Sequence, residues 1–419
     1  MSTAARLWSL RRRRPVFVVV VAITALSLFV YPLVDWWLRS IEVAPKFVYW
    51  DFGAFSGAVD RWEAGKSLYV QNEDGGYHGS YLYPPLVVVL FVPFTELGAE
   101  AATAWNIASV AFLWFSLQAL VTGLGYRLRW WESSLMLPLL VGFQPLLISL
   151  KLGQMAPFMA GLLTLSAAVM VQSDGRLKQG VSGAATAVVG LVKFAYAPVG
   201  AHLLRSRTRL LGAVTAGVVF VGASVLLVGV EAHRTYIDVL AWGVGQGGGT
   251  RPPTLWLPPY YRPIHWLPGA QALRLLGSFA IIAVAGLTDW GSDRTLFALG
   301  VSAFALLTPL PYTYYFVALL PAVVLLVDEE LTADGYPALP VLGLLCVHLH
   351  AYGLNFLANH LPSMLPPVQV LRPYFVLQPG LWGTLLLVGT ATLQVARDAE
   401  RPDALRTGAE EPESASTDD

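Results

Sequence analysis

The stretch that decides the fold is RRRRPVFVVVVAITALSLFVYPLV, residues 11–34. Its apolar part, from Pro15 to Val34, is about as long as an α-helix needs to cross the hydrocarbon core of a bilayer. Positively charged residues stay on the cytoplasmic side, so Arg11 to Arg14 place the N-terminus inside. A cleaved signal peptide is the competing interpretation, but its apolar region is roughly 7 to 15 residues long and ends at a small-residue cleavage site. Residues 31–35 offer no such site, so we interpret the run as a retained membrane anchor.

The composition of the whole chain agrees with a membrane protein. Of its 419 residues, 55% are hydrophobic and 13% are charged, whereas soluble domains carry about a quarter charged residues. The 27 basic residues balance the 27 acidic ones, so no electrostatic argument favours nucleic acid as a partner. A single cysteine, Cys346, excludes an intramolecular disulfide framework and a cysteine-clustered zinc site.

Further apolar runs follow the first one along the chain. They cover residues 101–121, 133–150, 155–172, 181–204, 209–230, 271–289, 294–309, 312–327, 338–357 and 379–396. Runs of this length and polarity are typical of membrane helices. We therefore expect an all-α integral membrane protein, a polytopic helical bundle of about 11–13 membrane segments.

If every run crossed the membrane once, the loops would alternate between its two sides, and some basic loops would lie outside the cytoplasm. Two segments are therefore expected not to cross the membrane as one continuous helix. The run 81–97 is short and contains three prolines, which favours a segment that dips into the membrane and returns. The run 181–204 is broken at Lys193 and Pro198, which favours two half-helices. Both termini then lie in the cytoplasm, and the outward-facing loops are 35–80, 151–154, 231–270, 310–313 and 358–378. An ordinary twelve-span count in which one or two loops violate the charge rule is the alternative.

The first outer loop, 35–80, contains a candidate helix. Its apolar residues recur at helical spacing: Phe52, Phe55, Val59 and Trp62. This pattern predicts an amphipathic helix lying on the outer membrane surface. Asp51 stands at its start, where the helix dipole favours a carboxylate, and Gly65 is its expected stop.

Three motifs carry a resemblance to a known family. They are Asp51-Phe52 with Ala58, Gly65, Tyr69 and YLYPPL at 81–86; Leu152-Gly153-Gln154 at the opening of a membrane helix; and Lys193 with Pro198 after the glycine-spaced stretch 180–190. This pattern resembles glycosyltransferase family 87, the polyprenol-phosphate-mannose-dependent mannosyltransferases of the GT-C fold. The resemblance implies a GT-C-like transmembrane domain over residues 1–397. The acidic segment 398–419 has the composition of a disordered cytoplasmic tail.

Two segments differ from the family pattern. Residues 308–315 read TPLPYTYY where the family usually has a Trp-Asp-His-His-like cluster. Residues 245–249 read GQGGG roughly where the family has an Asn-Gln-Ser stretch. The reaction class therefore follows from the resemblance more directly than the donor sugar or the linkage does.

A sugar linked to a lipid phosphate carries its own leaving group, so transfer needs a base for the acceptor hydroxyl, cations for the departing phosphate and a groove for the isoprenoid chain. Asp51 is the candidate general base, which predicts inversion at the anomeric carbon. The alternative is that Asp51 only caps the surface helix. Lys193 is a charge in an apolar run, at a cost of roughly 2.5 to 3.5 kcal/mol, and is the candidate partner of the lipid phosphate. A structural ion pair or snorkelling to the interface is the alternative.

The outer loop 231–270 and three other positions complete the candidate site. Arg251, Arg262 and His265 are basic groups among stiff aromatic segments, a pattern that suits phosphate binding. Interfacial anchoring explains the aromatic residues of this loop equally well. We expect substrate contacts from Tyr83, Gln154 and Tyr314.

Metal and cofactor sites find little support in the sequence. His348 and His350 alternate on an expected helix, so they point to different faces and make a poor metal pair. His78 lies beside Glu73 and Asp74, a cluster that is more typical of a solvated turn. We expect neither a metal nor a cofactor.

Together these features predict an integral glycosyltransferase of the cell membrane that acts at the outer face. It would move a hexose, above all mannose, from a polyprenyl or dolichyl phosphate carrier to a glycolipid or lipid-linked glycan. A transporter or flippase for a polyprenyl-linked substrate is the alternative, because broken helices and an intramembrane lysine suit that function too. A non-catalytic scaffold is a third class, but it would not need polar outer loops.

Overall fold

The computed structural model describes residues 8–42, 44–77, 79–172, 175–246, 264, 267–308, 312–352 and 379–400. The regular elements in these ranges are all helices. In chain order they are η1 (Leu10–Arg12), α2 (Pro15–Ser40), α3 (Trp50–Glu63), α4 (Val87–Thr95), η2 (Gly98–Glu100), α5 (Ala101–Gly123), α6 (Trp130–Gly142), α7 (Gln144–Leu152), α8 (Ala156–Gln172), α9 (Arg176–Val192), η3 (Phe194–Arg205), α10 (Arg207–Val228), α11 (Val230–Gln246), α12 (Ala270–Leu287), α13 (Asp293–Leu307), η4 (Thr313–Leu319), α14 (Leu320–Thr332), α15 (Ala338–His348), η5 (Leu349–Tyr352) and α18 (Pro379–Ala399).

Five of the described helices are long and apolar enough to cross a membrane: α2, α5 with η2, α10, α12 and α18. The pair α6 and α7 passes the same test jointly but is bent by 68°, as in a broken span or a re-entrant loop. The expected all-helical membrane fold is therefore confirmed. The expected count of 11–13 segments is higher than these five or six, because other apolar runs fold into shorter or broken helices such as α8 and α15.

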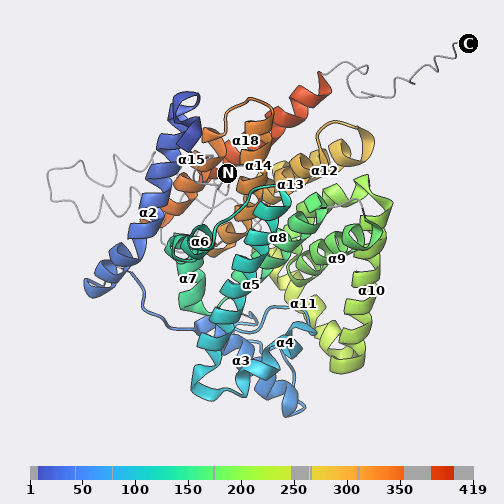
Figure 1. The fold of residues 1–419 in the computed structure, drawn as a ribbon. Coiled ribbons are helices and arrows are strands. Elements are labelled where there is room, and N and C mark those ends of the chain that lie inside the picture. The colour runs from blue at the N-terminus through green and yellow to red at the C-terminus, as the bar shows by residue number, and fades with distance from the viewer. Residues whose placement is uncertain are drawn as a thin grey trace, which may run out of the picture.

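The helix α13 lies in the core of the bundle. Its residues from Thr295 to Ala305 are all buried, and α12, α14, α18 and η3 pack against it. Figure 1 shows α2 and α10 on opposite flanks, and α3 and α4 together at one end of the molecule. Apolar side chains on the two flanking helices, such as Val16 and Leu226, stay exposed, which is the surface expected to face lipid.

Glycines bring α9 and α10 into close contact. A Cβ atom at Gly183 would lie 1.9 Å from the carbonyl oxygen of Arg209, and one at Gly212 would lie 2.2 Å from that of Gly180. Small residues let helix backbones approach each other in this way within membranes. The glycine-spaced stretch 180–190 is therefore, in part, a helix-packing surface.

The predicted break in the run 181–204 is confirmed. The helix α9 ends at Val192, and Lys193 has an extended backbone with φ −147° and ψ 101°. The chain then continues as the 3-10 helix η3, which contains Pro198. Proline lacks the amide donor that an α-helix needs at that position.

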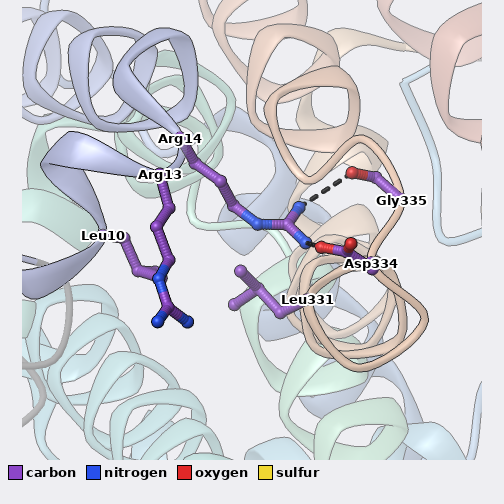
Figure 2. Close-up of a pocket in the computed structure, with 6 residues that line it drawn as sticks. All are labelled: Leu10, Arg13, Arg14, Leu331, Asp334 and Gly335. Carbon is purple, nitrogen blue, oxygen red and sulfur yellow. Dashed lines mark hydrogen bonds and ion pairs between the residues drawn. The ribbon is translucent and has the colours of Figure 1, made fainter.

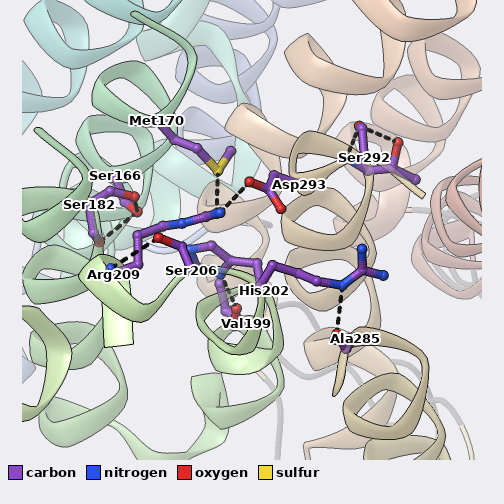
Figure 3. A network of polar contacts seen from close by, with 12 residues as sticks. Ser166, Met170, Ser182, Val199, His202, Ser206, Arg209, Ala285, Ser292 and Asp293 are labelled. Carbon is purple, nitrogen blue, oxygen red and sulfur yellow. Dashed lines mark hydrogen bonds and ion pairs between the residues drawn. The ribbon is translucent and has the colours of Figure 1, made fainter. Parts of the chain in front are cut away.

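The basic residues at the junction of η3 and α10 are tied into the bundle (Figure 3). The Nε of Arg205 donates to the carbonyl oxygen of Ala285 at 2.6 Å. The buried guanidinium of Arg209 contacts the Asp293 carboxylate and lies 3.4 Å from the sulfur of Met170. These contacts join the end of η3 to α12 and the start of α10 to α8 and α13, so the fold uses this cluster of charges.

The helix predicted in the first outer loop is α3, and it ends just before Gly65, whose φ is +66°. Its apolar stripe is buried inside the protein, which differs from the expected contact with the membrane surface. Phe52, Phe55 and Val59 are all buried, and the ring of Phe55 stacks on Phe91 of α4 with centroids 4.2 Å apart. The short helix α4 therefore provides the apolar surface that the stripe covers.

The proline-containing run 81–97 forms α4 and the turns around it. The nine residues of α4 rise about 14 Å, which is less than half of the hydrocarbon core of roughly 30 Å. This run does not cross a membrane as a helix. The short length and the three prolines of this run also predict, from the sequence, that it does not span the membrane.

Candidate functional site

The carboxylate of Asp51 is placed by the chain segment that leads into α3. The amides of Val48 and Tyr49 donate to the carbonyl oxygen of Lys151 at 3.0 and 2.9 Å. Tyr49 is the N-cap residue and has a left-handed backbone, with φ at 49°. Asp51 follows in the first turn of the helix rather than at the cap. The end of α7 therefore fixes where the Asp51 helix begins, and the cap interpretation of Asp51 gains no support.

Gly153 explains why α7 and α3 can meet so closely. It ends α7 in the left-handed conformation, with φ at 71°, a region that glycine enters at little cost. A Cβ atom at this position would lie 2.6 Å from the Cβ of Phe52. The glycine of the Leu152-Gly153-Gln154 motif thus serves both a turn and a contact with the residue next to Asp51.

Gln154 joins the other two predicted substrate residues, Tyr83 and Tyr314. Its Oε1 accepts hydrogen bonds from the Tyr83 hydroxyl at 2.9 Å and from the Met155 amide at 3.1 Å. Its Nε2 donates to the Tyr314 hydroxyl at 3.4 Å. The side chain is 5% exposed, so these bonds form in a largely dry environment. In the sequence Gln154 lies 71 residues from Tyr83 and 160 residues from Tyr314, yet the three side chains form one cluster.

The turn that carries Gln154 is held from a second side by α5. The indole Nε1 of Trp105 donates to the Gln154 carbonyl oxygen at 3.3 Å, and the amide of Asn106 donates to the Leu150 carbonyl oxygen at 2.8 Å. Buried backbone acceptors that are satisfied in this way resist displacement. The position of Gln154 is thus set by the scaffold.

Burial raises the pKa of the Asp51 carboxyl above its ordinary value. Hydrogen bonding by Gln154 and the positive charge of Lys193 both act in the opposite sense, because they favour the ionised form. A carboxylate with a raised pKa is a stronger base than one in free solution. At neutral pH such a group can accept a proton from a neighbouring hydroxyl.

The ammonium of Lys193 lies among aromatic rings. Its Nζ donates to the Tyr83 hydroxyl at 3.3 Å and lies 4.1 Å from the ring centroid of Tyr315. The ring centroids of Tyr83 and Tyr314 are 5.0 and 5.8 Å away. Within the described ranges no carboxylate lies within 4 Å of this nitrogen. We call Tyr83, Tyr314 and Tyr315 the tyrosine cage.

Comparison with known families decides which class of protein this is. A model of glycosyltransferase family 87 matches residues 81–327, more than half of the chain. The chain belongs to glycosyltransferase family 87. Tyr83, Gln154, Lys193 and Tyr314 lie inside the matched region, and Asp51 precedes it.

Comparisons with individual proteins add less. Among solved structures, this family 87 chain is similar to ArnT from Cupriavidus metallidurans in the apo state, with 13% sequence identity and a TM-score of 0.36, over 94% of this chain and 78% of that one. No curated protein matches. Family membership and the apolar helices together make the protein a multi-pass membrane glycosyltransferase.

The segment 35–80 of this glycosyltransferase, predicted to be an outer loop, also contacts α11. The rings of Tyr69 and Tyr236 stack with centroids 5.9 Å apart, and Tyr77 meets Trp242 edge to face at 5.8 Å. The hydroxyl of Tyr69 in turn donates to the Tyr83 carbonyl oxygen at 2.8 Å. The two long outer loops predicted from the sequence therefore meet beside the tyrosine cage.

Several predicted site residues and one tail lie outside the described residues. They are Arg251, Arg262 and His265 of the second outer loop, His78 of the first, and residues 401–419 of the acidic segment. Their predicted roles stay predictions.

Among the described residues, no group of three or more His, Cys, Asp or Glu side chains is placed to hold a metal ion. The two histidines considered from the sequence serve the fold. His348 accepts from the Gln144 amide at 3.2 Å, and His350 accepts from the Gly380 amide at 3.1 Å.

Two features of the glycosyltransferase were missed by the sequence analysis. Tyr315 is the ring nearest to the Lys193 ammonium, and no local pattern distinguishes it from the neighbouring aromatic residues. Asp35 forms a buried ion pair with Lys151. A carboxylate at the end of the first membrane run is a signal that could have been used, because charges in such segments need partners.

Proposed function

We propose that this glycosyltransferase transfers a hexose, above all mannose, from a polyprenyl or dolichyl phosphate carrier to a hydroxyl of a glycolipid or lipid-linked glycan. One observation carries the proposal. Asp51 is linked to Gln154, Gln154 to Tyr83, and Tyr83 to Lys193 by hydrogen bonds, and the charges of Asp51 and Lys193 are close enough to act on each other.

Asp51 is the proposed general base. It accepts the proton of the acceptor hydroxyl while that oxygen forms a bond to the anomeric carbon. The bond between the anomeric carbon and the phosphate oxygen breaks at the same time, and its electron pair leaves with the lipid phosphate. Attack opposite the leaving group inverts the anomeric centre. The raised pKa of Asp51 suits this role, since a stronger base takes the proton more readily.

Lys193 is the proposed partner of the leaving phosphate. Its direct contacts within the described ranges are with rings and a hydroxyl, so no described carboxylate forms an ion pair with it. A cation that is held in place where negative charge develops lowers the barrier without reorganising during the reaction. Arg251, Arg262 and His265 are proposed to contact the same phosphate.

Tyr83, Gln154 and Tyr314 are proposed to position the sugar. Aromatic rings pack against the apolar faces of sugars, and the amide and hydroxyl groups can bond to sugar hydroxyls. We place this chemistry at the outer face of the cell membrane and both termini in the cytoplasm, on the basis of the positive charges at residues 11–14.

The test uses purified protein, polyprenyl-phosphate-mannose and membrane lipid acceptors. The variant Asp51→Asn keeps the shape of the side chain and removes the base, so we expect transfer to fall by about 10²- to 10⁴-fold. Asp60→Asn is the matched control, because Asp60 is an exposed carboxylate on the same helix. Unchanged transfer by Asp51→Asn would show that the base assignment is wrong.

The same preparation separates transfer from transport. Native protein in liposomes is supplied with a labelled carrier on one side, and both sugar transfer and carrier movement are followed. If native protein and Asp51→Asn both moved the carrier and neither transferred sugar, the protein would be a flippase and the proposed enzyme activity would be wrong.

A further inference from the structure

A cavity of about 610 Å³ lies at the opposite end of α2 from the Asp51 site. Leu10, Arg13 and Arg14 line it from the segment that begins the first membrane helix, and Leu331, Asp334 and Gly335 line it from the turn after α14 (Figure 2). The helix α2 has 26 residues, so about 39 Å of helix separates this cavity from the chain that leads into α3.

One wall of the cavity is fixed by Arg14. Its guanidinium contacts the Asp334 carboxylate and donates to the Gly335 carbonyl oxygen at 2.8 Å (Figure 2). Asp334 has a left-handed backbone, with φ at 55°, and this turn conformation directs its carboxylate and the next carbonyl toward the arginine. The charge of Arg14 is therefore compensated within the protein.

Arg13 differs from its neighbour. Its side chain lies beside Leu10 at the cavity and has no dashed contact in Figure 2. Among the described residues it has no carboxylate within 4 Å. Within the described ranges, the Arg13 guanidinium at the cavity thus has no carboxylate partner and lies next to two leucine side chains, a combination that suits a phosphate group attached to an apolar molecule.

An apolar stripe on α2 begins one turn from the cavity. Val16, Val19, Ile23 and Leu26 are spaced so that they lie along one face, and they are 52% to 67% exposed. The stripe runs away from the arginines along the membrane helix. Trp8 is also exposed near the same end, and tryptophan is typical of the headgroup level.

We infer that the cavity binds the phosphate of an anionic phospholipid, with the headgroup against Arg13 and the acyl chains along the apolar stripe of α2. A free phosphate would use the guanidinium alone and would make no contact with the stripe. A zwitterionic lipid would bring its own cation to a site that already holds one. The inference rests on α2 and the turn after α14, and it does not depend on the proposed transfer reaction.

The experiment measures lipid retained by the purified full chain. Protein is reconstituted in vesicles of phosphatidylcholine and phosphatidylglycerol, extracted, and analysed by native mass spectrometry. We expect phosphatidylglycerol to be retained in preference to phosphatidylcholine. Arg13→Gln should lower that retention by roughly 10-fold, since one charge-assisted hydrogen-bonding group is lost. Arg176→Gln is the matched control, because Arg176 is an exposed arginine at the start of α9.

A second variant tests the cavity without changing its charge. Leu331→Trp fills the space beside Arg13, so retention should fall while the thermal unfolding midpoint stays near that of native protein. Equal retention by Arg13→Gln and native protein, or an equal loss in Arg176→Gln, would overturn the inference.

Competition identifies the source of the phosphate. Inorganic phosphate and glycerophosphoglycerol carry the charge without acyl chains, so we expect neither to displace the lipid at equimolar concentration. Displacement by either one would show that the site takes a free phosphate group and would overturn the lipid assignment.

Discussion

Lys151 and Lys193 each stand at the end of a helix in an apolar part of the chain, yet they have opposite surroundings. Lys151 and Asp35 are each 2% exposed, and their charged atoms are 2.5 Å apart. Asp35 also receives the Nε of Arg39 at 3.0 Å. Lys193 faces the tyrosine cage instead, with its nearest ring centroid 4.1 Å away.

The comparison separates a charge that holds the fold from a charge that can bind a ligand. The ammonium of Lys151 has a carboxylate partner. The backbone carbonyl of Lys151 accepts the hydrogen bonds that hold the segment before Asp51. The direct contacts of Lys193 in the described part of the chain are ring faces and one hydroxyl. A cation–π contact attracts a cation without neutralising it, so the charge of Lys193 stays available to an anion.

Loss of one member of the buried ion pair is expected to have the largest effect. Lys151→Met leaves the Asp35 carboxylate without its closest partner in a dry environment. The free energy of unfolding should fall by about 3 kcal/mol, the lower end of the usual range for a broken buried pair, because Arg39 still contacts the carboxylate. Denaturant unfolding in detergent micelles measures this change.

The double variant Asp35→Leu with Lys151→Met is the control, since it removes both charges. It should recover most of the lost stability, because apolar replacement of a whole buried pair is often neutral. If Lys151→Met were as stable as native protein, the structural role of the pair would be contradicted.

Loss of Lys193, which faces the tyrosine cage, should lower activity and leave the stability of the protein unchanged. Lys193→Met is expected to lower sugar transfer on the order of 10²-fold, the cost of removing a preorganised group that stabilises developing charge. Its unfolding midpoint should match that of Lys178→Met, which alters an exposed lysine on α9. Equal losses of stability in Lys193→Met and Lys151→Met would erase the distinction between the two lysines.

Loss of the nearest ring should have a smaller effect. Tyr315→Leu removes the ring that lies 4.1 Å from the Lys193 ammonium. A cation–π contact contributes about 0.5 to 2 kcal/mol, so kcat/KM for the lipid-linked donor should fall by roughly 2- to 30-fold. Tyr315→Phe keeps the ring and should retain activity near the native level. An equal loss in both variants would mean that the hydroxyl, not the ring, matters.

The smallest expected effect is a displacement of the pH profile. Asp51 must be ionised to accept a proton, so transfer should decline as the pH falls through its pKa, which lies above the ordinary 3.8. The positive charge of Lys193 lowers that pKa. Lys193→Met should therefore move the acid limb to higher pH, and Asp35→Leu with Lys151→Met should leave it in place. The measurement is the rate of sugar transfer between about pH 4 and 8. If native protein, Lys193→Met and the double variant all lost activity over the same acidic pH range, the effect of Lys193 on the pKa of Asp51 would be contradicted.

The elements that periodicity describes were predictable from the sequence. The spacing of Phe52, Phe55 and Val59 gave α3, and the charge and proline at Lys193 and Pro198 gave the break between α9 and η3. Both signals act within a few residues of chain. The same local signals could not tell whether the α3 stripe would cover lipid or protein.

Pairings across long stretches of chain were not predictable. Asp35 and Lys151 are 116 residues apart, and no pattern within either segment links their charges, although both side chains are buried and paired. The tyrosine cage joins residues from before α4 and from η4, and only the folded bundle brings them together. The motif residues Tyr83, Gln154 and Lys193 were found because the family resemblance supplied what local physics could not.

The close contact of Gly180 and Gly183 with α10 has a mechanical consequence. The helix α10 has 22 residues, so it behaves as a stiff rod about 33 Å long. Its first turns are pinned against α9, and its far end continues into α11, where Tyr236 touches the first outer loop. Any added bulk at Gly212 would tilt this rod at its pinned end, and the displacement would be magnified where α11 meets Tyr69.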